Sequence, residues 1–344
     1  MLRGDEPPPL RAVRRSRLAQ AILDHRRGQA ITFVGYSEVR TELAEALNHK
    51  CVYCEMALRK QGSPVEHFRP KACVHNEGEA RDHSRYWWLA WTWNNLLLAC
   101  GRCNNQPNKG NQFPLVPGTQ PLPSLSFDVD KEQPLLIDPA RVEPREHLRF
   151  RWSKTRQRWL PLAIGGSKQG AKTIEVLGLS EDDRPTEHVC ERVEPWCKEL
   201  DEHIRRGDTK AVQRTWTRLT KSLFAPKQPF HAVTWDALDT RYPQAERQRW
   251  QLTLPRLGRL DSTRATAPVF DDPAGFEEIT DDELRLRIRA LGDQAPPQAM
   301  QAVLDEVLAI RDWTPDELAA LLRRRVATVR AYLRERRDKP TPAP

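Results

Sequence analysis

The sequence lacks a long apolar run and an export signal. Its longest apolar stretches, at residues 87–91 and 96–99, are far shorter than the roughly 20 residues of a membrane-spanning helix. The first ten residues, MLRGDEPPPL, carry acidic side chains and three prolines where a secretory signal has an unbroken apolar core. We therefore expect no membrane association and a cytoplasmic location.

The chain contains few cysteines, seven in 344 residues, and seven is an odd number that cannot be paired completely. Without an export signal, this count predicts reduced thiols and excludes a disulfide framework. Four of the seven form two CxxC pairs, Cys51 with Cys54 and Cys100 with Cys103, a spacing that lets both thiolates of a pair reach one metal ion. Because thiolates suit zinc, we predict one structural zinc site built from both pairs.

Acidic residues are fewer than basic ones. The chain has 55 Lys and Arg against 47 Asp and Glu, a net charge of +8 and a pI near 9.2. Residues 1–30 hold seven arginines against three acids, and residues 311–339 hold nine bases against five acids. This pattern favours a polyanionic partner. With 39% hydrophobic residues and a mean hydropathy of −0.70, a fibre and a fully disordered chain are excluded.

Local patterns predict how the chain is organised. Two apolar runs, HLRFRW and RWLPL, flank SKTRQ and predict a β-hairpin. Helical periodicity covers residues 37–48, 171–179 and 186–223. Threonine followed by glutamate three residues later predicts helix starts at Thr280 and Thr314. We expect a basic helical segment (1–46), a core with both CxxC pairs (47–117), a hairpin and helical extension (118–253), a linker (254–276), a helical domain (277–337) and a disordered tail (338–344).

Between the CxxC pairs lies Glu66-His67, and two asparagines, Asn95 and Asn104, flank the second pair. Hydrolysis of a phosphodiester needs an activated water and a cation that offsets charge on the phosphate oxygens. Neutral His67 could accept the proton of the water near pH 7. Oxygens of Glu66 and Asn104 suit Mg²⁺ or Mn²⁺. The sequence thus predicts a second, catalytic metal beside the structural zinc.

The same strings resemble the HNH endonuclease family, whose core is a two-stranded ribbon and a helix around a metal. The match covers CVYC, EHFRP, NLLLACGRCN and the later KG. The resemblance implies that His67 is the general base, that Asn95 holds the ribbon loop, and that Glu66 and Asn104 bind the catalytic ion. The family usually has aspartate where Glu66 stands, and Asn94 and Asn105 offer alternatives to Asn95 and Asn104.

A longer series of strings over residues 45–180 resembles the PtuB-like HNH subunits of Septu anti-phage systems and the HNH proteins that accompany some retrons. These strings are EHFRPK, YWWLAW, NLLLAC, KGNQFPL, PLLIDP and EHLRF, in this order. The resemblance implies a defence nuclease that works with an ATPase partner.

These patterns together predict an α+β fold, with a small ββα-metal nuclease core and a four-cysteine zinc staple embedded in a mostly helical protein. We expect cleavage of phosphodiester bonds in DNA, with Arg69, Lys71 and Lys109 contacting phosphates. The alternative is a zinc-stabilised module that binds nucleic acid without cutting it, or a DNA-binding regulator that uses helices near residues 314–336. Trp87, Trp88, Trp91 and Trp93 could stack on bases, but their density favours packing in a core.

Overall fold

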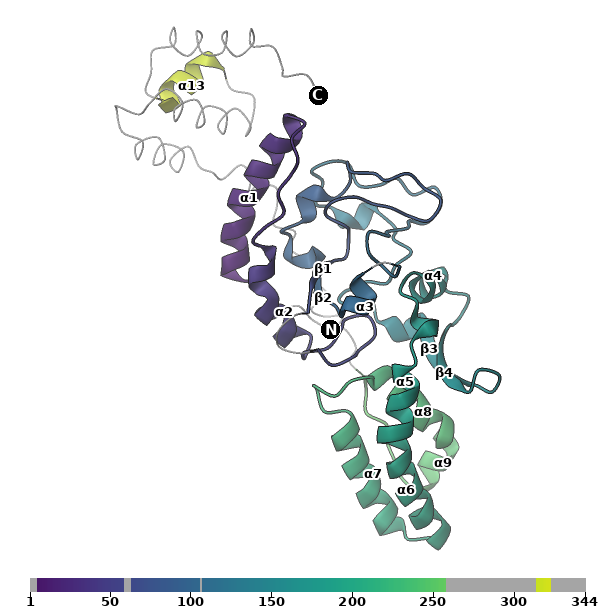
Figure 1. The fold of residues 1–344 in the computed structure, drawn as a ribbon. Coiled ribbons are helices and arrows are strands. Elements are labelled where there is room, and N and C mark those ends of the chain that lie inside the picture. Colours follow the sequence, from purple (N-terminus) through teal and green to yellow (C-terminus); the bar gives the residue numbers. More distant parts are fainter. Residues whose placement is uncertain (1–4, 59–62, 106, 258–313, 323–344) are drawn as a thin grey trace. The chain divides into compact units, whose positions relative to one another are not determined.

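The computed structural model describes residues 5–58, 63–105, 107–257 and 314–322 (Figure 1). The chain divides into two compact units, one formed by Met1–Pro7 and Ser37–Pro268 and the other by Pro8–Tyr36 and Val269–Pro344. Nearly all of the predicted linker and C-terminal domain, the predicted tail and the predicted helix start at Thr280 lie outside the described residues. Among the described residues, no helix is long and apolar enough to cross a membrane.

The unit that contains residues 37–268 combines many short helices with two small antiparallel sheets, so the predicted α+β class is confirmed. Short 3₁₀ turns connect several of the elements. Its helices and strands are α2 (Arg40–Ala46), β1 (Val65–His67), β2 (Leu96–Leu98), α3 (Gly101–Asn104), β3 (Leu148–Ser153), β4 (Arg158–Ala163), α4 (Lys168–Val176), α5 (Arg184–His188), a π-helical turn (Val189–Val193), α6 (Glu194–Arg206), α7 (Thr209–Leu223), α8 (His231–Arg241) and α9 (Gln244–Arg249).

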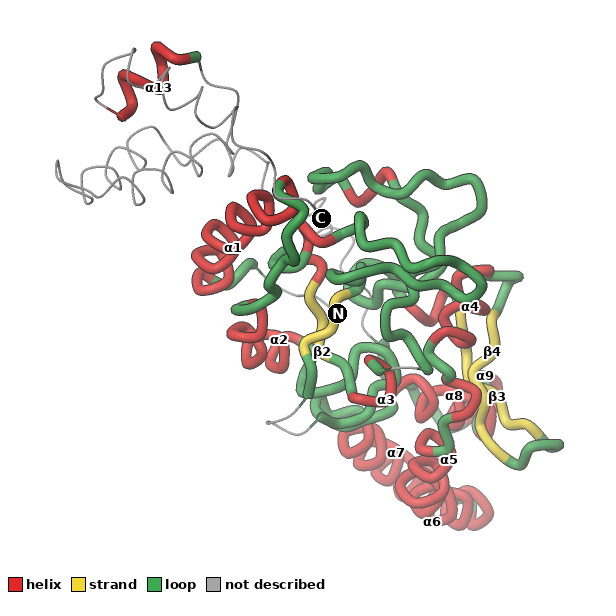
Figure 2. Tube along the Cα trace, turned by 45° about the horizontal axis from the view of Figure 1, so that its top comes forward, coloured by secondary structure: helices red, strands yellow, loops and turns green. Residues whose placement is uncertain are grey.

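The first sheet is a two-stranded ribbon of β1 and β2 (Figure 2). Its register pairs Val65 with Leu98 and His67 with Leu96. All six strand residues are buried, which explains why β2 is a run of three leucines with no polar alternation. The short helix α3 begins at Gly101, with two residues between it and β2, and the Cys100 side chain accepts a hydrogen bond from the backbone N–H of Cys103 at the start of the helix. The order of elements here is therefore strand, strand, helix.

The aromatic segment packs beside this ribbon. Trp87, Trp88, Trp91 and Trp93 are all buried, so the predicted role in a core is confirmed. The ring centroids of Trp87 and Trp88 lie 5.7 Å apart in an edge-to-face arrangement, a geometry that aromatic pairs prefer.

The second sheet is the predicted hairpin, which is confirmed by the pairing of β3 with β4 from Leu148 with Ala163 to Ser153 with Arg158. A carboxylate from another element holds it in place. Asp236 on α8 accepts hydrogen bonds from the backbone N–H of Phe150 at 2.7 Å and from Arg149 Nε at 2.6 Å. The hairpin is thereby fixed to the helices that follow it.

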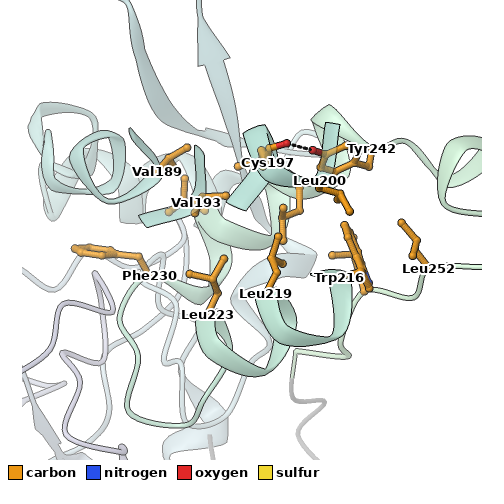
Figure 3. Close-up of a cluster of buried hydrophobic side chains, with 14 of the residues drawn as sticks. Val189, Val193, Cys197, Leu200, Trp216, Leu219, Leu223, Phe230, Tyr242 and Leu252 are labelled. Carbon is orange, nitrogen blue, oxygen red and sulfur yellow. Dashed lines mark hydrogen bonds between the residues drawn. The ribbon is translucent and has the colours of Figure 1, made fainter. Parts of the chain in front are cut away.

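The π-helical turn and helices α6, α7 and α8 share one apolar core (Figure 3), which residues 250–254 complete. Leu200 on α6 and Val212 and Leu219 on α7 are fully buried there. The helical pattern predicted for residues 186–223 is interrupted at Gly207 and Asp208. Gly207 has a φ of +69°, which glycine adopts without steric cost, and the Asp208 carboxylate caps α7 by accepting from Ala211 N.

The other unit contributes α1 (Pro8–Arg26) and α13 (Pro315–Leu322). The predicted basic segment contains the helix α1, on which Leu18 and Ile22 are buried. The predicted helix start at Thr314 is confirmed. Thr314 Oγ1 accepts from Glu317 N at 3.3 Å, and the Glu317 carboxylate accepts from Thr314 N at 2.9 Å.

Candidate functional site

The four paired cysteines form one cluster. Their sulfur atoms all lie within 4.8 Å of one another, and Cys54 Sγ is 3.8 Å from Cys100 Sγ. Four thiolates at the usual zinc–sulfur distance of about 2.3 Å on a tetrahedron have their sulfurs about 3.8 Å apart. The prediction that both CxxC pairs build one site is confirmed, and the site has the size and donor set for a metal such as zinc.

An arginine from the helical extension lies against this cluster. Arg184, at the start of α5, has a guanidinium nitrogen 3.7 Å from Cys54 Sγ and an ion pair of 2.7 Å with Asp182. Arg102, between the two cysteines of the second pair, donates to the carbonyl of Gly178 at 2.6 Å. A guanidinium at this place would offset the negative charge of thiolates bound to a metal, and these contacts join the cysteine cluster to the following helices.

Glu66 is buried on β1 next to a buried lysine. Lys109 Nζ lies 2.5 Å from Glu66 Oε1 and also donates to the carbonyl of His67 at 2.9 Å. The Tyr53 hydroxyl donates to the same Glu66 oxygen at 3.5 Å. Burial raises the pKa of Glu66, and the charge of Lys109 opposes that rise. The backbone N–H of Lys109 donates to Cys103 O at 3.3 Å, so Lys109 joins α3 to the ribbon.

His67 is also buried, and one of its ring nitrogens is bonded to the backbone. Nε2 lies 2.9 Å from the carbonyl oxygen of Ala90. A carbonyl oxygen only accepts, so Nε2 carries the ring proton and Nδ1 has the lone pair in the neutral ring. Burial, together with the charges of Lys71 and Lys109, lowers the pKa of His67 well below its usual value. The imidazole is therefore neutral at pH 7.

The two predicted asparagines have different environments. Asn95 is buried, its Oδ1 accepts from Arg69 N at 2.8 Å, and its Nδ2 donates to the carbonyls of Arg69 and Leu89 at 3.0 and 3.1 Å. Its neighbour Asn94 is half-buried. Asn104 is half-buried at the end of α3, where its backbone N–H donates to Cys100 O.

The residues predicted to contact phosphates are mostly enclosed. Arg69 is 3% exposed and Lys109 is fully buried, and each is paired with an internal carboxylate, Glu132 for Arg69 and Glu66 for Lys109. These two cations therefore belong to the interior of the scaffold in this structure. Lys71 is half-buried.

Glu132 was not found by sequence reasoning. Its carboxylate accepts from Arg69 Nε at 2.8 Å, from Leu122 N at 3.1 Å and from the hydroxyl of Tyr86. It lies 63 residues after Arg69 in a proline-rich segment. The one available signal is indirect: an arginine buried in a core requires a carboxylate partner.

The chain is similar to Septu proteins of bacilli. It is 35% identical over 143 residues to Septu protein PtuB of Bacillus mycoides (strain KBAB4), which is 41% of this chain and 46% of that protein. It is 28% identical over 152 residues to Septu protein PtuB of Bacillus thuringiensis, 44% of each chain. It is also 28% identical over 134 residues to Septu protein PtuA of Bacillus mycoides, 39% of this chain and 18% of that protein.

The chain spans less than half the length of each of these relatives. No protein-family model matches it, and no solved structure does. The predicted relationship to PtuB is confirmed over about 41% of the chain.

Proposed function

We propose that this chain is a metal-dependent endonuclease of the HNH type that hydrolyses phosphodiester bonds in DNA. The observation that carries the proposal is the position of Glu66-His67 on a two-stranded ribbon that leads directly into the cysteine cluster and α3. This order of strand, strand and helix matches the core expected of that family. The cysteine cluster holds zinc and keeps the ribbon in place, because without it the three-residue strands have little to stabilise them.

His67 is the general base in this proposal. Its bond to Ala90 O fixes the ring orientation and the tautomer, so that Nδ1 accepts the proton of the attacking water. The lowered pKa of His67 keeps the ring unprotonated at pH 7. Asn95 is a positioning residue, because it joins the chain just after β1 to the segment just before β2 through three hydrogen bonds to the backbone.

A carboxylate and an amide oxygen are suitable donors for a hard divalent cation. Lys109 and Tyr53 contact Glu66 at Oε1, and the His67 backbone also bonds to this carboxylate. The Glu66 carboxylate would bind Mg²⁺ or Mn²⁺ together with the side chain of Asn104. When bound, such an ion offsets the charge that develops on the phosphate. Lys109 orients the Glu66 carboxylate and cancels part of its charge.

The phosphates of a DNA substrate need basic side chains that are exposed to solvent, and α7 carries such side chains. Its 15 residues contain no Asp or Glu, and its basic residues Lys210, Arg214, Arg218 and Lys221 are all exposed. We call this set the α7 basic face. Positive charge along one helix face attracts a nucleic-acid backbone without reading its sequence, so the α7 basic face supplies phosphate contacts that Arg69 and Lys109 do not. Lys71 is the third predicted contact and remains in the proposal.

The similarity to PtuB and PtuA supports a place in anti-phage defence. In this proposal the chain is the effector nuclease and acts with a separate ATPase subunit. A chain related to PtuB would take the nuclease role beside a PtuA-like partner.

Supercoiled plasmid incubated with Mg²⁺ or Mn²⁺ tests the proposal. We expect the wild-type protein to nick the plasmid and His67→Ala to be slower by about 10²–10⁴-fold. His83→Ala is the matched control, because this histidine is exposed in the segment between the ribbon strands. Equal nicking by the wild type and His67→Ala would refute the mechanism. DNA binding without nicking by the wild type would favour the alternative of a zinc-stabilised binding module.

A further inference from the structure

A cavity of about 260 Å³ lies beside the first CxxC pair, apart from Glu66 and His67. It is bounded by the loop that carries Cys54, by the start of β3 and by the start of α8. Much of its wall is apolar, formed by Val52, Ile137, Leu148, Phe150, Leu177, Leu179, Phe230 and Val233. Its volume equals about nine water molecules at roughly 30 Å³ each, which is enough for one aromatic ring with a substituent.

One buried cation, Lys50, lines this cavity. Its side chain comes from the residue before Cys51 and is 4% exposed. Lys50 Nζ lies 3.3 Å from His231 Nδ1. His231 Nε2 lies 3.1 Å from the carbonyl of Ala225 and therefore carries the ring proton, so Nδ1 accepts from Lys50.

The acidic groups of the wall are bonded to protein donors. Glu55 accepts from Ala232 N at 2.7 Å at the start of α8, and Glu143 accepts from Arg145 N at 3.3 Å. Asp182 is ion-paired with Arg184. These carboxylates are thus engaged in holding the wall together.

Lys50 is different, because an ammonium has three N–H donors. Within the part of the chain that the structure describes, His231 Nδ1 is its hydrogen-bond acceptor, and the carboxylate of Glu55 acts on it through charge alone. Donors of a buried ammonium that lack an acceptor are costly. The cavity is the space in which an acceptor for them can lie.

We propose that this cavity binds a small molecule that carries a carboxylate or a phosphate on an apolar, ring-sized body. The oxyanion accepts charge-assisted hydrogen bonds from Lys50. The body packs against Leu148, Phe150 and Phe230. The cavity contains both features of a ligand site, an apolar wall and a small number of polar groups, among which Lys50 is the buried cation. Cys54 of the metal cluster and Tyr53 also line the cavity, but the proposal does not rest on the nuclease function, because Lys50 and the apolar residues that would hold the ligand have no role in it.

Isothermal titration calorimetry on the full chain tests this proposal with four probes. Benzoate and phenyl phosphate represent the carboxylate and phosphate sources, benzamide is the neutral analogue, and inorganic phosphate is the anion without a body. We expect at least one of the first two to bind with one site per chain. Benzamide and inorganic phosphate should each bind at least tenfold more weakly, because benzamide has no negative charge and inorganic phosphate has no apolar ring.

Two variants locate the binding. Lys50→Met should weaken binding of the aromatic anion at least tenfold, whereas Lys198→Met, at an exposed lysine on α6, should leave it unchanged. Ala232→Phe fills the cavity and keeps both Lys50 and the backbone N–H that Glu55 uses, so it should also abolish binding. Circular dichroism and zinc content show whether each variant is folded.

Several outcomes would overturn the proposal. They are absence of binding by both aromatic anions, equal binding of benzamide, and unchanged affinity in folded Lys50→Met or Ala232→Phe protein. If benzoate binds and phenyl phosphate does not, the natural ligand is a carboxylate, and the reverse result assigns a phosphate ester.

Discussion

Arg69 provides a sharp test of how this scaffold is built, because its sequence context predicts a phosphate contact and the structure buries it. Its guanidinium pairs with Glu132 at 2.8 Å, and the two side chains are 4% and 0% exposed. Phe113 lies against the same guanidinium, with 5.2 Å from the ring centroid to Arg69 Cζ. We predict that Arg69→Met lowers the free energy of unfolding. We do not expect it to act by removing a contact with DNA.

The magnitude follows from the ion pair. Arg69→Met leaves the Glu132 carboxylate buried with hydrogen bonds from Leu122 N and Tyr86 but no counter-charge. Removing one partner of a buried pair costs about 3–5 kcal/mol. For a unit of this size that loss lowers the melting temperature by roughly 6–20 °C.

The assay is thermal unfolding followed by tryptophan fluorescence. Arg151→Met, at an exposed arginine on β3, is the control and should shift the melting temperature little. The double variant Arg69→Met/Glu132→Gln removes both charges and should recover about 0.5–3 kcal/mol of the loss. If Arg69→Met melts like the wild type but binds DNA more weakly, Arg69 contacts phosphate and the argument from burial is wrong.

Three further predictions concern zinc, pH and salt. Cys103→Ser should lower bound zinc from one ion per chain to nearly none, measured by metal analysis after gel filtration; retained zinc would refute the four-cysteine site. Burial lowers the pKa of His188 to about 4. Because an unfolded histidine titrates near 6.5, the contribution of His188 to stability should be constant above pH 6.5 and fall by at most about 3 kcal/mol as the pH drops to 4. His188→Gln should flatten that fall in urea titrations, and an unchanged profile would contradict the assignment. In DNA-binding titrations, Lys210→Ala/Arg214→Ala should reduce the slope of log K against log salt by about 1.8. An unchanged slope would exclude the α7 basic face from the interface.

Features that depend on near neighbours in the chain could be predicted from the sequence. The capping of α13 by Thr314 and Glu317 needs residues three positions apart, and the β3–β4 hairpin needs two apolar runs around a short turn. The two CxxC pairs lie further apart, but each pair is local, and one metal site requires both. The sequence therefore predicted that cluster without any knowledge of the path between Cys54 and Cys100.

The candidate site was predicted in its residues but not in its surroundings. Glu66, His67 and Asn95 could be chosen from their spacing. That Ala90 O fixes the ring of His67 depends on the path of the loop between the strands, and that Lys109 folds back onto Glu66 depends on the path of the chain after α3. Spacing along the chain carries no information on these contacts, because loops of one length can follow many paths.

The amino-acid sequence alone determined the four-cysteine cluster, the class of fold, the hairpin and the relationship to PtuB, since each rests on local spacing or on strings that can be read directly. Only the tertiary structure decided which charges are buried. Arg69 meets Glu132 across 63 residues, and Lys50 meets His231 across 181 residues to line a cavity. The physical reason is that a charged side chain can be buried only where another group pairs with it, and which group lies close enough depends on the folded chain.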